Sequence, residues 1–210
     1  SPRIDLKQNP LYEDNNLAFF KTHYYGGIKK WQWVTIPLAI HGTVCKNDGT
    51  TVDICIGEDD NDPIFYITDI LPHLGHEQNG RPMGSAIDGE SLNVMVTASP
   101  FDDDKADQKY KLNFLAAMYE KYGITEADFM SAELCIIPAQ NSADVGLDRW
   151  LIGAYGHDDR CCGYTALTAL IDNADSAKTV VVALADMIVG AHCSGVYLFS
   201  TCISVGAESF

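Results

Sequence analysis

Residues 36–56 read IPLAIHGTVCKNDGTTVDICI, and this stretch decides the fold of the first half of the chain. On both sides of its centre, apolar residues alternate with other residues at a period of two, as in a strand with one buried face. The centre, Asn47-Asp48-Gly49-Thr50, has the residues of a tight hairpin turn. The stretch therefore predicts an antiparallel β-hairpin, and Trp31 and Trp33 extend its first strand backwards.

The pattern around this hairpin is β-rich up to about residue 107. An acidic loop is expected over 57–63 and a short strand over 64–67. Residues 79–107 are rich in Gly, Ser and Asp, with one apolar run at 92–96. A loop of this length is typically functional or mobile.

Helical signals begin after residue 107. Apolar residues recur at three- and four-residue spacing between Leu112 and Tyr122, which predicts a helix over 107–122. Gly123 is suited to end it. Thr125-Glu126-Ala127-Asp128 resembles a capping box that opens a short second helix.

The second half has a different pattern. An apolar strand is expected over 132–138, a helix over 160–172 and a continuous apolar run over 179–185. Continuous apolar runs are typical of strands that are buried on both faces. Strand, helix and strand in this order predict a right-handed βαβ unit, so the fold class is α/β with a β-rich module before it.

Composition narrows the possible partners. The 210-residue chain has a formal net charge of −15, and its pI is about 4.5. Phosphate binding needs clustered Lys and Arg, so we expect no nucleic-acid partner. An anionic membrane surface is excluded for the same reason.

Cysteine usage and the ends of the sequence suggest where the protein resides. The seven cysteines are odd in number and form no CxxC motif, which favours a reducing, cytoplasmic location. No signal peptide and no membrane-spanning run is visible. The chain begins at Ser1 without an initiator Met, so we expect a processed or truncated piece.

The most informative polar cluster is Asp158-Asp159-Arg160, which follows a glycine-rich approach and opens the expected helix. One carboxylate at this point can bridge two metal ions while its neighbour orients the ligands. The alternative is structural, because Asp is a common N-cap and acids favour helix N-termini. The spacing by itself leaves both open.

The histidines give weaker signals. His73 and His76 are three residues apart and could share a metal ion on one helical face, although no third ligand lies nearby in the sequence. The alternative is a pair of surface histidines. His23, His41 and His192 belong to no constellation, and no nucleophile elbow, Walker motif or dinucleotide-binding fingerprint is present.

Nine segments together resemble one known family. They are SPRIDLK (1–7), HYYGGIKK (23–30), WVTIPLA (33–39), GED (57–59), ITDILPHL (67–74), KYGIT (121–125), SAEL (131–134), DVGLDR (144–149) and LIGAYGHDDR (151–160). The pattern resembles the aspartyl aminopeptidase family of zinc metallopeptidases, in a bacterial branch similar to aminopeptidase I. The resemblance covers roughly residues 1–185.

The resemblance implies a fold and an assembly. A partial α/β metallopeptidase domain of parallel or mixed sheet, residues 141–210 with 1–7, would be interrupted by a β-rich dimerisation domain over 8–140. Homodimers would assemble into a dodecamer that acts on peptides. Each complete active site would hold two zinc ions, with manganese or cobalt as alternatives.

The resemblance also assigns residues. Asp158 corresponds to the bridging metal ligand, with Asp159 and Arg160 beside it. His73 corresponds to a histidine that contacts substrate in a neighbouring subunit's site. From Asp186 onward the resemblance ends, and no Glu stands where the general base is expected. No catalytic residue is therefore expected in this chain.

Two classes of function follow. The chain is either part of a zinc-dependent aminopeptidase that cleaves N-terminal residues from peptides, and is inactive by itself, or a non-catalytic assembly module or dead paralogue of that family. The mass of the native polypeptide separates them. A mass near 23.0 kDa favours the second class.

Overall fold

The computed structural model describes residues 2–25, 27–175, 177–184 and 203–205, with the backbone alone for Tyr25, Asp158, Asp159 and 203–205. The chain divides into two compact units, Pro2–Asn141 and the residues from Ser142 onward. Among the described helices, none has the length and apolar character needed to cross a membrane.

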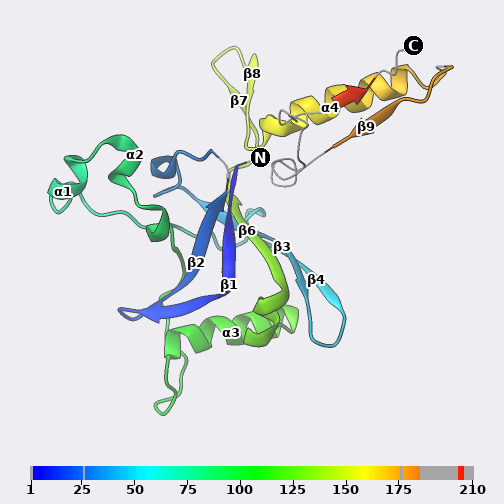
Figure 1. The fold of residues 1–210 in the computed structure, drawn as a ribbon. Coiled ribbons are helices and arrows are strands. Elements are labelled where there is room, and N and C mark those ends of the chain that lie inside the picture. Colours follow the sequence, from blue (N-terminus) through cyan, green and yellow to red (C-terminus); the bar gives the residue numbers. More distant parts are fainter. Residues whose placement is uncertain (1, 26, 176, 185–202, 206–210) are drawn as a thin grey trace. The chain divides into compact units, whose positions relative to one another are not determined.

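The first unit is built on a six-stranded sheet with the order β4-β3-β6-β1-β2-β5 (Figure 1). Every neighbouring pair in this sheet is antiparallel. The strands are β1 (Arg3–Asp14), β2 (Leu17–Tyr25), β3 (Leu38–Cys45), β4 (Thr51–Ile56), β5 (Val94–Thr97) and β6 (Ala132–Pro138).

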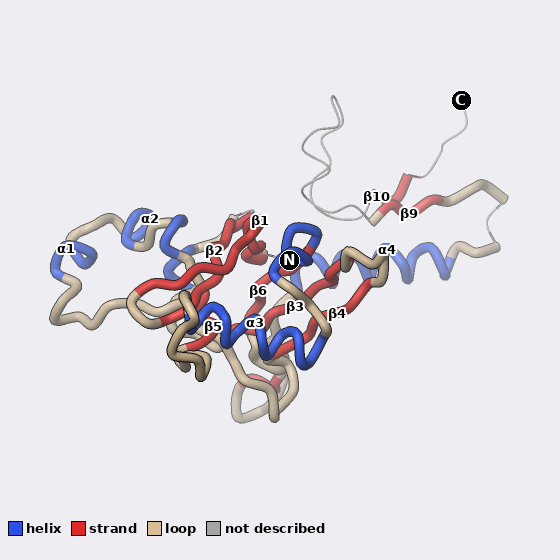
Figure 2. The backbone as a smooth tube through the Cα atoms, turned by 90° about the horizontal axis from the view of Figure 1, so that it is seen from below, coloured by secondary structure: helices blue, strands red, loops and turns tan. Residues whose placement is uncertain are grey.

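The core lies on one face of this sheet. A cross-strand row of isoleucines runs from β1 to β4, with Ile4 opposite Ile136, Ile136 opposite Ile40, and Ile40 opposite Ile56. All four are buried. Helix α3 (Lys109–Tyr122) contacts β1, β2 and β5 (Figure 2). Phe20 of β2 packs edge-on against Phe114 of α3, with ring centroids 5.1 Å apart.

The predicted hairpin is confirmed. β3 and β4 pair with Val44 opposite Val52, and the turn lies at residues 46–50. Asp48 accepts hydrogen bonds from the backbone N–H and the hydroxyl of Thr50, at 2.8 and 2.6 Å. The turn residues therefore close the hairpin by local contacts.

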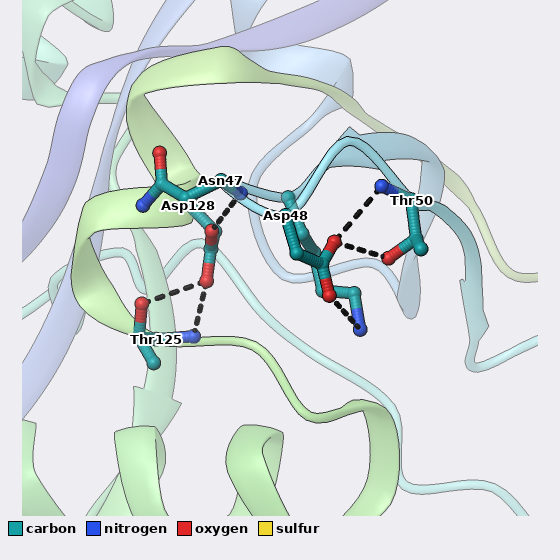
Figure 3. Close-up of polar contacts among 6 residues, drawn as sticks. Asn47, Asp48, Thr50, Thr125 and Asp128 are labelled. Carbon is teal, nitrogen blue, oxygen red and sulfur yellow. Dashed lines mark hydrogen bonds and ion pairs between the residues drawn. The ribbon is translucent and has the colours of Figure 1, made fainter.

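A second network joins this turn to the 3-10 helix η3 (Glu126–Ser131) (Figure 3). The carboxylate of Asp128 accepts hydrogen bonds from Thr125 N and Thr125 Oγ1 at 2.8 and 2.7 Å, which confirms the capping box. Its other oxygen accepts from Asn47 N at 3.0 Å. One buried carboxylate thus connects two segments about 80 residues apart.

The helix predicted over 107–122 is confirmed as α3, and Gly123 ends it with φ +65°, a conformation that glycine adopts readily. Short elements occupy the long loop before it. These are α1 (His76–Asn79), α2 (Met83–Ala86) and η2 (Gly89–Ser91).

Two local predictions were wrong. Trp31 and Trp33 do not extend β3, because the chain forms the 3-10 helix η1 (Lys30–Gln32) and then turns at Thr35, whose φ is +59°. The strand expected over 64–67 is reduced to two isolated bridges, Leu38 with Phe65 and Tyr66 with Met95.

The second unit contains one helix and two small two-stranded antiparallel sheets in its described part. β7 (Ala143–Val145) pairs with β8 (Leu151–Gly153), α4 (His157–Asp172) follows, and β9 (Val181–Ala183) pairs with β10 (Ile203–Val205). The predicted βαβ unit is absent from the described residues. β6 belongs to the first unit's sheet, where only one of its faces packs on the core.

The start of the first unit also differs from the expected division. Residues 1–7 were assigned by resemblance to the second part. However, Arg3 to Leu6 pair with β2, and Ile4 and Asp5 pair with β6. These backbone hydrogen bonds make residues 3–7 the beginning of the first unit's sheet.

Candidate functional site

The cluster that the sequence singles out lies at the start of α4. The chain leaves β8, turns, and places Gly156 at the N-cap position with φ 88° and ψ 15°. α4 begins at His157, within two residues of Asp159 as predicted. Asp158 and Asp159 follow in the first turn, where backbone N–H groups are unpaired and acidic residues are favoured.

This placement narrows the alternatives for the two acids. The N-cap residue is Gly156, so neither Asp158 nor Asp159 has the N-cap role that the sequence allowed. Only the backbone of these two residues is described, and their part in metal binding stays a prediction. Arg160 is exposed on the same turn.

The side chains beside the two acids are held to the surrounding backbone and helix. His157 Nε2 lies 3.1 Å from the carbonyl oxygen of Ile152 in β8. Cys161 Sγ lies 4.0 Å from His157 Nδ1, one helical turn on. The imidazole therefore lies close to both the backbone of β8 and the thiol of Cys161.

A catalytic zinc ion usually has three protein ligands and an open position. Among the described side chains, no group of three His, Cys, Asp or Glu residues comes together at this helix. The described residues alone do not fit a complete zinc site. Residues 186–188, where the family's general base is expected and the sequence has no Glu, lie outside the described residues.

His73 lies in a turn before α1, where Leu74 N and Gly75 N both donate to the carbonyl oxygen of Leu71. It is exposed, as are Leu71 and Leu74. His76 is the first residue of α1, so the two histidines do not share a helical face. Within the described part of the chain no third ligand joins them, which favours the interpretation that they are two surface histidines.

A different group of metal-ligand residues comes together in the first unit. His41 of β3, Cys55 of β4 and Glu58 have one potential ligand atom each, and these atoms all lie within 4.8 Å of one another. His41 Nδ1 is 3.0 Å from Glu58 Oε1. His41 was predicted to be isolated, and this prediction was wrong.

The hairpin pattern contained the signal for two members of this group. A turn centred on Asp48 pairs residues whose numbers sum to 96, so His41 stands opposite Cys55. Paired residues of an antiparallel ladder project to the same face. Glu58 could not be placed this way, because it lies in the loop beyond β4.

Comparison with known proteins finds relatives that match both units of the chain. The model of the family described as "Aminopeptidase I zinc metalloprotease (M18)" matches residues 1–190. A Clostridium acetobutylicum protein named "Probable M18 family aminopeptidase 1" is 52% identical over 186 residues, which cover 89% of this chain and 40% of that protein. The chain thus spans about two fifths of the length of this relative.

Solved structures show the same fold. The crystal structure of an M18 family aminopeptidase from Thermotoga maritima matches with a TM-score of 0.77 and 50% identity, covering 81% of this chain and 37% of that one. A more distant match is the S. cerevisiae mApe1 dodecamer, with a TM-score of 0.54 and 19% identity over 84% of this chain and 37% of that one. At that identity the likeness concerns the fold alone.

Proposed function

This chain belongs to the M18 family of aminopeptidase I zinc metalloproteases, and we propose that it is part of a zinc-dependent aminopeptidase that removes N-terminal residues from peptides. The observation that carries the proposal is the family match over residues 1–190, which includes the two carboxylates at the start of α4. The second half of the chain is then a portion of the catalytic domain.

In this proposal Asp158 would serve as a carboxylate ligand of the metal centre, and Asp159 and Arg160 would orient the groups around it. The first turn of α4 is a favourable position for two carboxylates, because the N-terminal end of a helix carries a partial positive charge that stabilises acidic side chains. A bound zinc pair would supply an activated water. Manganese or cobalt could replace zinc with such oxygen and nitrogen ligands.

The isolated 210-residue chain is proposed to be inactive. A site of two ions needs several ligands beyond Asp158, and the described side chains near α4 do not supply a set of three. A single aspartate recovers little of the hydration energy that a divalent cation loses. The missing ligands would come from segments of the longer relatives that this chain does not span.

The first unit is proposed to act in assembly, as the dimerisation domain of a homo-oligomer that reaches a dodecamer. The segment around His73 supports this role, because Ile70, Leu71, Leu74 and Met83 are large apolar residues that are exposed in the single chain. In an assembly His73 would contact peptide in the site of a neighbouring subunit.

A cytoplasmic location is the companion proposal. All five cysteines among the described residues are free thiols. Free thiols persist most easily in a reducing compartment.

The competing function is that of a non-catalytic assembly module or a dead paralogue of the family. The first unit buries a core of its own, whereas the described side chains near α4 do not supply three metal ligands, and this contrast supports the alternative. The mass of the native polypeptide separates the two. A mass near 23.0 kDa supports the module, and a mass about twice as large supports the enzyme.

The activity test compares the 210-residue chain with a version extended to the full length of its relatives. Zinc stoichiometry is measured by elemental analysis and turnover with aminoacyl-nitroanilides. We expect turnover only in the extended protein, where Asp158→Ala abolishes it and leaves the assembly intact in sedimentation. Metal-dependent turnover by the 210-residue chain would overturn the proposal.

A further inference from the structure

A row of metal-binding residue types crosses the sheet of the first unit, on the face opposite the isoleucine row. Cys55 of β4 stands opposite His41 of β3, His41 opposite Cys135 of β6, and Cys135 opposite Asp5 of β1. Their sequence neighbours Ile4, Ile40 and Ile136 form the core row, so the two rows face opposite sides of the sheet. The outer row is open to solvent at its β3–β4 end, where His41 and Cys55 are exposed.

The loop after β4 brings a third donor to this end of the row. Gly57 turns the chain with φ +104°, and its N–H donates to Asp62 at 3.0 Å, which closes the acidic loop. The loop places Glu58 beside His41, with 3.0 Å between Glu58 Oε1 and His41 Nδ1. Three different donor types therefore meet at one point.

The spacing of these donors is close to that of a metal site. The three ligand atoms lie within 4.8 Å of one another. Around a tetrahedral zinc ion, with bonds of about 2.0–2.3 Å, ligand atoms are separated by roughly 3.3–3.6 Å. All three residues are exposed, so small side-chain rotations can make a shift of this size.

The surroundings of the thiol are negatively charged. Burial and then the carboxylates of Glu58, Asp62 and Asp59 raise the pKa of the Cys55 thiol. The same negative field attracts a cation, although Lys121 lies 3.8 Å from Asp62 and offsets part of it. A bound divalent ion dominates the local field and stabilises the thiolate form.

Cys135 is not part of this group of donors. Its Sγ lies 3.3 Å from the carbonyl oxygen of His41, to which the thiol donates a hydrogen bond. The donors at the exposed end are then one imidazole, one thiol and one carboxylate. Sulfur and nitrogen donors favour zinc-class ions over magnesium or calcium.

We propose that His41, Cys55 and Glu58 bind one zinc-class divalent cation through imidazole Nδ1, thiolate sulfur and carboxylate oxygen, with water in the fourth position. The site lies within the first unit and uses none of the residues at α4. Binding releases the thiol proton to solvent and involves no redox step.

Cobalt(II) is the probe, because a cobalt–thiolate bond produces a charge-transfer absorption that oxygen and nitrogen ligands do not. The full 210-residue chain is titrated under reducing conditions. We expect one equivalent of cobalt to produce the thiolate band and zinc to abolish it by competition. Cys55→Ser should remove the band, and His41→Gln and Glu58→Gln should each weaken binding by about tenfold or more.

Two control variants locate the site. Cys45→Ser removes another exposed thiol of the same hairpin and should leave the titration unchanged. Asp158→Ala should also leave it unchanged, which separates this site from the proposed peptidase site. Circular dichroism verifies that each variant is folded.

A second measurement does not depend on cobalt. Zinc should slow the alkylation of Cys55 by iodoacetamide, mapped by peptide mass, without slowing that of Cys45. The proposal is overturned if the wild-type chain gives no thiolate band, if the band survives in Cys55→Ser, or if zinc protects both thiols equally. In those cases His41 and Glu58 form a surface ion pair only.

Discussion

The two units of the chain differ most in how many of their apolar side chains are buried. The first unit buries a continuous core, to which all six strands of its sheet, α3 and η3 contribute. In the described part of the second unit, Ala166 is the only buried apolar residue. Large apolar side chains are exposed on β7, β8, α4 and β9. They include Val145, Leu151, Ile152, Leu167, Ile171 and Val181.

The two units therefore differ in whether their described residues bury their own apolar faces. A sheet or helix is stable when its apolar face is buried against another layer. The first unit meets that condition within residues 2–141. The second unit does not meet it within its described residues, which agrees with a chain that spans about 40% of a relative's length. If the proposed function holds, these apolar faces would pack against segments of the longer relatives that this chain does not span.

Removal of a central aromatic side chain is expected to destabilise the first unit most. Phe20 is buried and contacts Phe114 and Phe129, with ring centroids 5.1 and 5.7 Å apart. Phe20→Ala should lower the free energy of unfolding by about 3–5 kcal/mol, through lost burial and a cavity. Urea denaturation followed by circular dichroism measures the change.

The matched change in the second unit is Leu167→Ala in α4. Leu167 is 49% exposed, so the same measurement should change by less than about 1 kcal/mol. Equal losses for the two variants would mean that the units are not different in packing.

Alanine substitution of one glycine in each unit tests how tightly the backbone of that unit is packed. Gly42 of β3 has φ +146°, and a Cβ atom there would lie 2.0 Å from the carbonyl oxygen of Glu133 in β6. Gly42→Ala should therefore destabilise the first unit by about 2–3 kcal/mol, through backbone strain. Thermal unfolding measures this loss.

Gly163 in α4 is the control for that change. A Cβ atom at Gly163 meets no other atom within 4 Å. Gly163→Ala should favour the helix by roughly 0.5–1 kcal/mol and increase its content in circular dichroism. Destabilisation by Gly163→Ala would show that α4 packs more tightly than its exposed side chains indicate.

The smallest expected effect is on the stability of the first unit at acidic pH. Hydrogen bonds from the hydroxyl and backbone N–H of Thr125, and from Asn47 N, hold the pKa of Asp128 below its ordinary value. Because the pKa is lower in the folded state, the stabilisation is present above the unfolded pKa of about 4 and is lost as pH falls through the folded value.

Unfolding experiments between about pH 6 and pH 2 test this expectation. In Asp128→Asn the loss of stability across that range should be smaller than in the wild-type chain. The control is Asp53→Asn, an exposed residue whose carboxylate accepts a hydrogen bond from Thr43 at 2.7 Å. If both variants follow the wild-type curve, Asp128 does not contribute to the acid sensitivity.

Short-range patterns identified many elements of this protein correctly. The hairpin turn at residues 47–50, α3 with Gly123 after it, the Thr125–Asp128 capping box and the start of α4 were all predicted from neighbouring residues. These features depend on turn chemistry, helix periodicity and capping, which act over a few residues. The family, too, was predicted from short motifs and is confirmed by the comparisons.

Long-range packing determined the rest. The strand order β4-β3-β6-β1-β2-β5 places β6 between β3 and β1, whereas its apolar run suggested a βαβ unit. The break in extended structure at Thr35 was also not predicted. Nor was the position of Glu58 beside His41 and Cys55. Such contacts depend on which distant segments bury one another's apolar faces, and a local pattern of residues does not specify that choice.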